Sequence, residues 1–161
     1  MPSIRESVMA NLLTAIQAIN GSPTYVNTIT SQQVVSREPW TIVEITRANQ
    51  FPAILLSEDT MTPDYHFEQT AAFVPSDMTL YAFDVAILVA VEARSQANTA
   101  LNSWLADVLK AVMVDITRGG VAYDTVMTSI AAPQENRVVP DGLAAAEMRF
   151  RVKYMSAANT L

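Results

Sequence analysis

Residues 78–93 form the clearest strand-like segment of the chain, and they constrain the fold more than any other segment. One set of alternating positions is large and apolar: Tyr81, Phe83, Val85, Ile87, Val89 and Val91. The other set is small and nearly apolar: Leu80, Ala82, Asp84, Ala86, Leu88 and Ala90. Since alternate residues of a strand share a face, we predict that other parts of the protein cover both faces.

Two amphipathic helices are predicted, one before and one after this strand. The first begins after Ser3, which forms a capping box with Glu6, and it ends at Asn20 and Gly21. The second spans residues 96–117, and we expect it to be the main packing element against the sheet. Its apolar stripe consists of Ala97, Leu101, Trp104, Leu105, Val108, Leu109, Val112, Met113 and Ile116.

Four further strands complete the predicted fold, at residues 24–35, 51–57, 123–132 and 144–155. Residues 40–48 fit either a short helix or a strand, and this choice stays open. Since the strands can pair as antiparallel hairpins, the predicted class is α+β. We expect an antiparallel sheet with two main helices packed on one face, in the order α-β-β-β-α-β-β.

One domain is predicted over residues 1–161, with long loops at residues 58–77 and 133–143. The length suits a single domain, and there is no internal repeat or low-complexity linker. Loops this long in compact domains are usually functional or disordered. The partner-contacting surface is therefore predicted to come from these two segments.

The composition favours a chain that assembles with other proteins. Hydrophobic residues make up 50% of it and charged residues 16%, whereas an average domain has about 25% charged residues. Either some apolar surface is buried against other chains, or the many alanines inflate the hydrophobic count. No run reaches the ~18 apolar residues that cross a bilayer, there is no signal-peptide pattern, and cysteine is absent. We expect a soluble protein that is made in the cytoplasm.

The charge distribution argues against tight binding of nucleic acid. The net charge is −6, and the stretch between Arg47 and Arg94 holds seven acidic residues but no lysine or arginine. A protein that binds nucleic acid through its phosphate groups needs clustered basic residues, and this chain lacks such a cluster.

Residues suited to catalysis are scarce. The only histidine, His66, lies near Asp64, Tyr65 and Glu68. These four form either an oxygen-rich metal-ligand set or part of a solvated loop, and the second is favoured because nothing indicates rigidly held ligands. No glycine-rich phosphate motif is present. We therefore predict no enzyme activity, no catalytic or cofactor-binding residue, no metal and no cofactor.

Ten residues are predicted to contact partners. Arg149, Arg151 and Lys153 form a basic row on the last strand, which is either its solvent face or a contact with an acidic neighbouring subunit. Trp40, beside Pro39, lies either at an interface or within the fold. The full set is Trp40, Glu58, Asp59, Asp64, Glu68, Glu135, Arg137, Arg149, Arg151 and Lys153.

The order of these elements carries a family resemblance. After the N-terminal helix come the segment Phe51–Leu56, an acidic stretch and the strand Leu80–Val91. A helix with leucines at 101, 105 and 109 leads to Val114-Asp115-Ile116, and the last strand ends in Phe150-x-Val152-x-Tyr154. Over roughly residues 3–155 the chain resembles the tail terminator proteins of tailed bacteriophages, also called tail completion or minor tail proteins.

The resemblance implies a structural virion protein with no catalytic residues. Such proteins form a ring, commonly hexameric, that caps the tail tube at its head-proximal end and stops its polymerisation. The implied partners are further copies of the chain, the major tail tube protein and the head-tail connector or neck protein. DNA passes through the ring without specific binding, and an acidic chain suits this because like charges form no phosphate contacts.

Two other functions stay open. The chain could be another head-to-tail connector of the same virion, or a small ligand-binding α+β regulatory domain. The second needs a concave pocket with convergent polar groups, and no such cluster is visible in the sequence.

Overall fold

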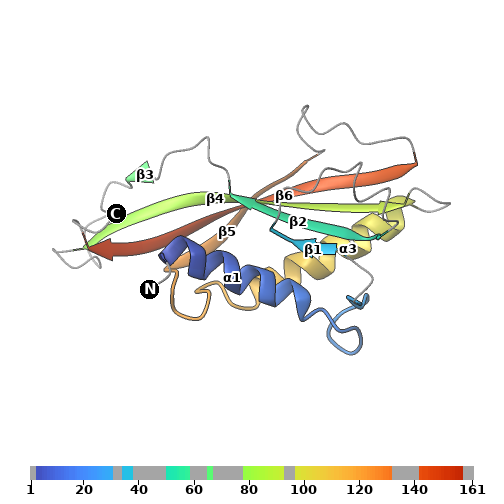
Figure 1. The fold of residues 1–161 in the computed structure, drawn as a ribbon, viewed down its shortest axis with the longest axis horizontal. Helices are drawn as coiled ribbons and strands as arrows, with labels where there is room; N and C mark the ends of the chain where they lie inside the picture. Colours follow the sequence, from blue (N-terminus) through green and yellow to red (C-terminus); the bar gives the residue numbers. More distant parts are fainter. Residues whose placement is uncertain are drawn as a thin grey trace.

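The computed structural model describes residues 3–30, 34–37, 50–58, 65–66, 78–92, 97–131 and 142–157. The elements within these residues are shown in Figure 1. They are α1 (Ile4–Gln17), β1 (Val34–Ser36), β2 (Ala53–Glu58), β3 (Tyr65–His66), β4 (Met78–Glu92), α3 (Ala97–Met113), β5 (Asp124–Ala131) and β6 (Leu143–Ala157). The two helices and the mixed sheet confirm the predicted α+β class.

The strands form one sheet in the order β1-β2-β4-β6-β5, and the short β3 pairs with β4 beside this path. The pairs β2–β4, β4–β6 and β5–β6 are antiparallel, as predicted. The pair β1–β2 is parallel, so the prediction of an antiparallel sheet is wrong at this edge. Residues 37–52 separate these two strands, and a connection of that length permits the crossover that parallel pairing requires.

The centre of the sheet is the ladder between β4 and β6, which pairs Met78 with Ala157 at one end and Glu92 with Leu143 at the other. The predicted strand at residues 78–93 is therefore confirmed. Its large side chains, such as Ile87, and its small ones, such as Ala82, are both buried. Coverage of both faces is confirmed for this central strand.

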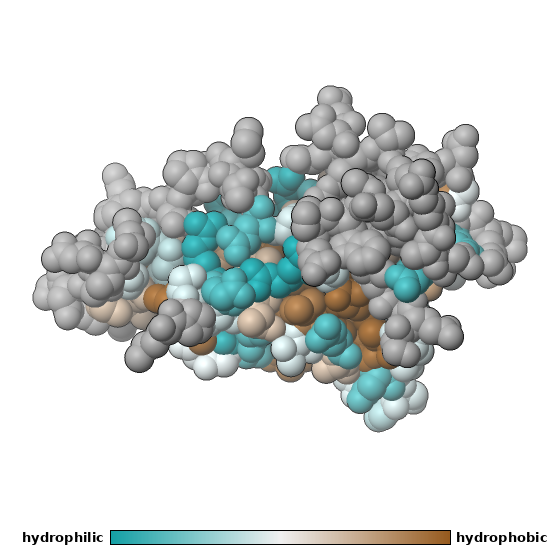
Figure 2. All heavy atoms as spheres, viewed as in Figure 1, coloured by the Kyte–Doolittle hydropathy of each residue, from teal (hydrophilic) through white to brown (hydrophobic). Residues whose placement is uncertain are grey.

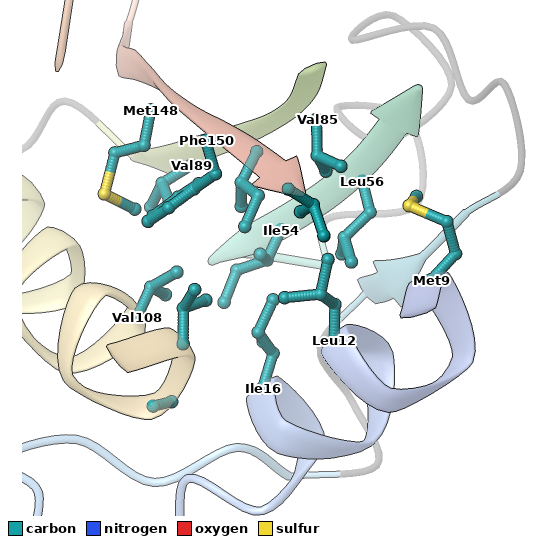
Figure 3. Close-up of a cluster of buried hydrophobic side chains, with 14 of the residues drawn as sticks. Met9, Leu12, Ile16, Ile54, Leu56, Val85, Val89, Val108, Met148 and Phe150 are labelled. Carbon is teal, nitrogen blue, oxygen red and sulfur yellow. The ribbon is translucent and has the colours of Figure 1, made fainter. Parts of the chain in front are cut away.

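The main apolar cluster joins the two helices to the sheet. Figure 3 shows Met9, Leu12 and Ile16 of α1 and Val108 of α3 pointing towards side chains of the sheet. A second cluster consists of the alternate residues Ala53, Leu55 and Leu88, with Phe51, Leu143 and Ala145 packed against it. Burying one large apolar side chain fully stabilises the fold by roughly 1.5–3 kcal/mol. Because β4 contributes side chains to both clusters, burial on each of its faces stabilises its position at the centre of the sheet.

Both helices end earlier than predicted. Ser3 caps α1 as expected, because its hydroxyl accepts the N–H of Glu6 at 3.2 Å, but the helix ends at Gln17. Helix α3 ends at Met113, and the next residues form turns. Ile116 is therefore not part of the helical stripe and is exposed. The side chain of Asp115 accepts backbone N–H groups in this turn, which competes with continued helix formation.

Other predicted boundaries change in part. Residues 24–30 form turns and irregular backbone with one isolated bridge at Thr28, so the strand predicted at 24–35 is wrong there. Residues 31–33 lie outside the described residues, and 34–36 form β1. The predicted loop 58–77 contains the last residue of β2 and the two residues of β3, and residue 143 of the predicted loop 133–143 begins β6. Residue 142 forms a turn, and the other residues of both loops and the ambiguous segment 40–48 lie outside the described residues.

Candidate interaction surfaces

Four of the ten predicted contact residues are among the described ones: Glu58, Arg149, Arg151 and Lys153. The remaining six lie outside the described residues, and they are Trp40, Asp59, Asp64, Glu68, Glu135 and Arg137. The structure therefore describes the basic row of the last strand and one acidic residue of the first long segment, and it does not bring these two parts together.

The basic row of β6 is paired with carboxylates of the same sheet. Arg151 forms a two-pronged ion pair with Asp84 of β4, with Nε–Oδ1 and Nη2–Oδ2 distances of 2.7 and 2.8 Å. Arg149 Nε lies 3.0 Å from Glu147 Oε1, and Lys153 Nζ lies 3.9 Å from Asp124 Oδ2 of β5. The register explains two of these pairs, because Asp84 and Asp124 lie directly opposite their partners.

These ion pairs neutralise much of the charge of the basic row. Glu147 is buried, and the three cations are half-buried rather than fully exposed on a solvent face. Two-pronged arginine–carboxylate pairs are among the stronger hydrogen-bonded contacts in proteins. The row is therefore an array of neutral pairs, so attraction to an acidic neighbouring subunit is weaker than the sequence alone suggests.

Glu58 belongs to a second charged cluster near the start of α1. Its carboxylate lies 3.2 Å from Arg5 and 3.8 Å from Arg37. Arg37 also forms two hydrogen bonds with Glu6, at 2.6 and 2.9 Å. The hydrogen bond from Arg37 lowers the pKa of the Glu6 carboxyl and raises that of the arginine. This cluster connects α1, β1 and β2, and Figure 2 shows hydrophilic residues gathered in this part of the molecule.

A rigid loop missed by the sequence analysis spans residues 21–30. The buried carboxylate of Asp107 in α3, only 4% exposed, accepts the backbone N–H groups of Val26 and Asn27 at 3.1 and 2.7 Å. It also accepts the side-chain amide of Asn27 at 2.8 Å. Lys110 donates to the carbonyl of Thr24 at 2.6 Å. No local pattern reveals this contact, since the partners are about 80 residues apart.

Hydrogen bonds made by its own side chains stabilise the turn after α3. Asp115 accepts the N–H of Thr117 at 3.0 Å and that of Gly119, and the hydrogen bond from the Thr117 hydroxyl is the main reason that the pKa of this carboxyl is lowered. Arg118 adopts a left-handed φ of 53° and is only 1% exposed. Its guanidinium donates to the carbonyl of Val112, and burial lowers its pKa. These contacts fix the path from α3 into β5.

Large apolar residues left exposed gather along this path. Seven are exposed among the described residues, and six of them lie between positions 113 and 130. We call these six the apolar edge: Met113, Val114, Ile116, Tyr123, Val126 and Ile130. The hydroxyl of Thr125 in β5 donates to the carbonyl of Ile116 at 2.8 Å, which attaches the turn to this strand. Within the turn, the N–H of Ala122 donates to the carbonyl of Thr117 at 2.8 Å. The seventh residue, Val26, is 81% exposed on the loop held by Asp107.

No group of histidine, cysteine and acidic residues that could bind a metal is found in the described part of the chain. The proposed ligand set around His66 is outside that part except for the backbone of β3. None of the helices formed by the described residues is both long and apolar enough to span a membrane. In comparisons with known proteins, no family model and no curated protein matches this chain.

Proposed function

We propose that this protein is a structural virion component, a ring-forming tail terminator that caps the tail tube of a bacteriophage. The ring consists of further copies of the chain, most simply six, and it lies at the head-proximal end of the tail. There it stops tube polymerisation and joins the tail to the connector or neck protein. The proposal includes the packing expected from the sequence, with both main helices on one face of the sheet. The short β3 adds a fourth strand between the helices to the expected order α-β-β-β-α-β-β.

The apolar edge is the observation that carries this proposal. Exposed apolar residues scattered singly are ordinary, whereas several of them in one part of the fold are typical of a surface that binds another protein. Six of the seven such residues lie in one continuous stretch of 18 positions, from the end of α3 through β5. A protein that functions by assembly has a reason to keep this surface.

The paired charges of β6 support the second part of the proposal, the passage of DNA. Each of Arg149, Arg151 and Lys153 has a carboxylate within 4 Å in the same sheet. Cations that are already paired gain less from contact with phosphate, because the existing ion pair must first be broken. With a net charge of −6, such a chain suits a channel through which DNA slides.

The test combines the purified full-length chain with the major tail tube protein encoded in the same genome. Tubes polymerised with the chain present are expected to be shorter, and negative-stain images should show extra density at one end with six-fold symmetry. The chain alone, at 17.6 kDa per copy, is weighed by light scattering in parallel. An unchanged distribution of tube lengths with no density at either end would contradict the proposal, and density on the head connector alone would favour a neck protein.

A further inference from the structure

The outer side of β5 has the features of an interior strand, although β5 is the last strand of the sheet. It pairs only with β6, and no other described strand lies on its outer side. Edge strands usually carry lysine or proline, which discourage pairing with another strand. The eight residues of β5 include no lysine, arginine or proline, and most are β-branched or apolar.

Apolar side chains lie on both faces of β5. Val126, 41% exposed, is directly opposite Arg151, so it shares the face of the paired charges. Ile130, 48% exposed, is directly opposite the buried Met148, so it lies on the face of the main apolar cluster. A strand that pairs beside β5 would give each of these exposed side chains a cross-strand apolar neighbour, one on each face of the sheet. The side-chain pattern of β5 therefore suits a strand with a neighbour on its outer side.

The bulge in β5 does not protect this edge by itself. The register shifts between Met127 and Ser129, and the hydroxyl of the intervening Thr128 donates to the carbonyl of Arg149 in β6 at 3.1 Å. The extra residue is thus anchored towards β6. Two stretches of regular strand remain, one on each side of the bulge, and no described strand pairs with their outer backbone groups.

We propose that the outer side of β5 pairs in antiparallel fashion with β5 of a second copy of this chain, forming a two-fold dimer with one continuous sheet. The local charge selects this partner. The only ionised residue of the strand is Asp124 at its first position, and it is already paired with Lys153. An edge without free charge offers little to a nucleic acid or a charged peptide, and its recognition rests on backbone hydrogen bonds and apolar contacts.

Antiparallel self-pairing is also free of charge conflict. When two copies are centred on the middle of the strand, Asp124 of one lies opposite Ala131 of the other, and the two aspartates are at opposite ends. A parallel arrangement would place the aspartates side by side, which is unfavourable. A two-fold contact closes after two copies, so it differs from the head-to-tail contacts of a ring, and this inference does not rest on the proposed function.

The first experiment measures the mass of the full chain by sedimentation at tens of micromolar. The wild type is expected to be dimeric, and Val126→Lys should weaken the dimer by about tenfold or more, since a lysine would be placed opposite a strand. Val26→Lys is the matched control, because it adds the same charge at an exposed valine away from β5. A monomeric wild type would overturn the inference, and so would equal weakening by both variants.

The second experiment uses the absence of cysteine from the chain. Mixing Val126→Cys with Ser129→Cys introduces one thiol in each copy, and the self-pairing that places Asp124 opposite Ala131 brings these two positions opposite each other on the same face. Oxidation should then give covalent dimers, whereas Val26→Cys should give few. Circular dichroism checks that each variant is folded. Absence of covalent dimers from the folded mixture of Val126→Cys and Ser129→Cys proteins would refute self-pairing, whether or not the chain also caps tail tubes.

Discussion

The central strand β4 and the edge strand β5 are both rich in strand-forming residues, yet their surroundings differ. β4 has a hydrogen-bonded neighbour on each side and is buried on both faces, whereas β5 has one neighbour among the described strands and keeps Val126 and Ile130 exposed. The residue types predict a strand in both places but do not indicate its position in the sheet. The difference shows that the free energy of a given side chain depends on its position, and four predictions test this.

The largest expected difference in the free energy of unfolding is between an isoleucine variant in β4 and one in β5. Ile87→Ala in β4 removes a fully buried side chain and should lower the free energy of unfolding by about 2–5 kcal/mol. Ile130→Ala in β5, where the side chain is half exposed, should cost less than about 1 kcal/mol in the monomer. Urea denaturation at low protein concentration measures both. Equal losses would mean that β5 is as buried as β4 under these conditions.

The second prediction concerns the helix that covers the centre of the sheet. Leu105 is buried in the main cluster and Leu109 is only partly buried against it. Leu105→Ala should therefore cost about 2–5 kcal/mol, and Leu109→Ala should cost less. Thermal unfolding of the two variants gives the ranking. A loss below about 1 kcal/mol at both positions would mean that α3 is peripheral to the core.

The third prediction concerns the buried carboxylate of Asp107. Asp107→Ala leaves the N–H groups of Val26 and Asn27 without their partner, and it should cost about 1–3 kcal/mol. Hydrogen exchange should become faster at these two amides, with little change in the β4–β6 ladder. Asn27→Ala, which keeps both backbone contacts, is the milder control. If exchange in residues 21–30 is unaffected by Asp107→Ala, the carboxylate does not hold the loop.

The smallest effect is expected in the turn that leads to β5. The pKa of Asp115 is lowered in the folded state, so the unfolded chain binds its proton first as the pH falls. The stabilisation is thus present above the ordinary pKa of 3.8 and is lost as the pH falls through the lowered value. Asp115→Asn should flatten the dependence of stability on pH in this acid range. Identical acid unfolding profiles for the variant and the wild type would contradict this.

The sequence predicted those parts of the fold that depend on local patterns. Alternation identified β4 and β6, strand-forming residues identified β5, helical spacing identified α1 and α3, and Ser3 marked the start of the first helix. Each of these signals lies within a short window of residues, because side-chain periodicity and capping are properties of neighbouring positions. The α+β class follows from such patterns alone.

Contacts between distant residues were decided by the tertiary structure. Asp107 and Val26 meet only because α3 packs beside the loop, and Arg151 finds Asp84 only through the register of β4 and β6. The cations predicted to form a basic row are thus paired with carboxylates of the sheet. The segment 24–30, predicted as a strand, is instead a loop whose backbone is bound by the carboxylate of Asp107. The sequence by itself determined where the two helices and the strands β2, β4, β5 and β6 lie, since the patterns that indicate them are local. The order of the strands in the sheet decided which apolar residues stay exposed, and hence where a partner can bind, because exposure depends on contacts between segments that are distant in the sequence.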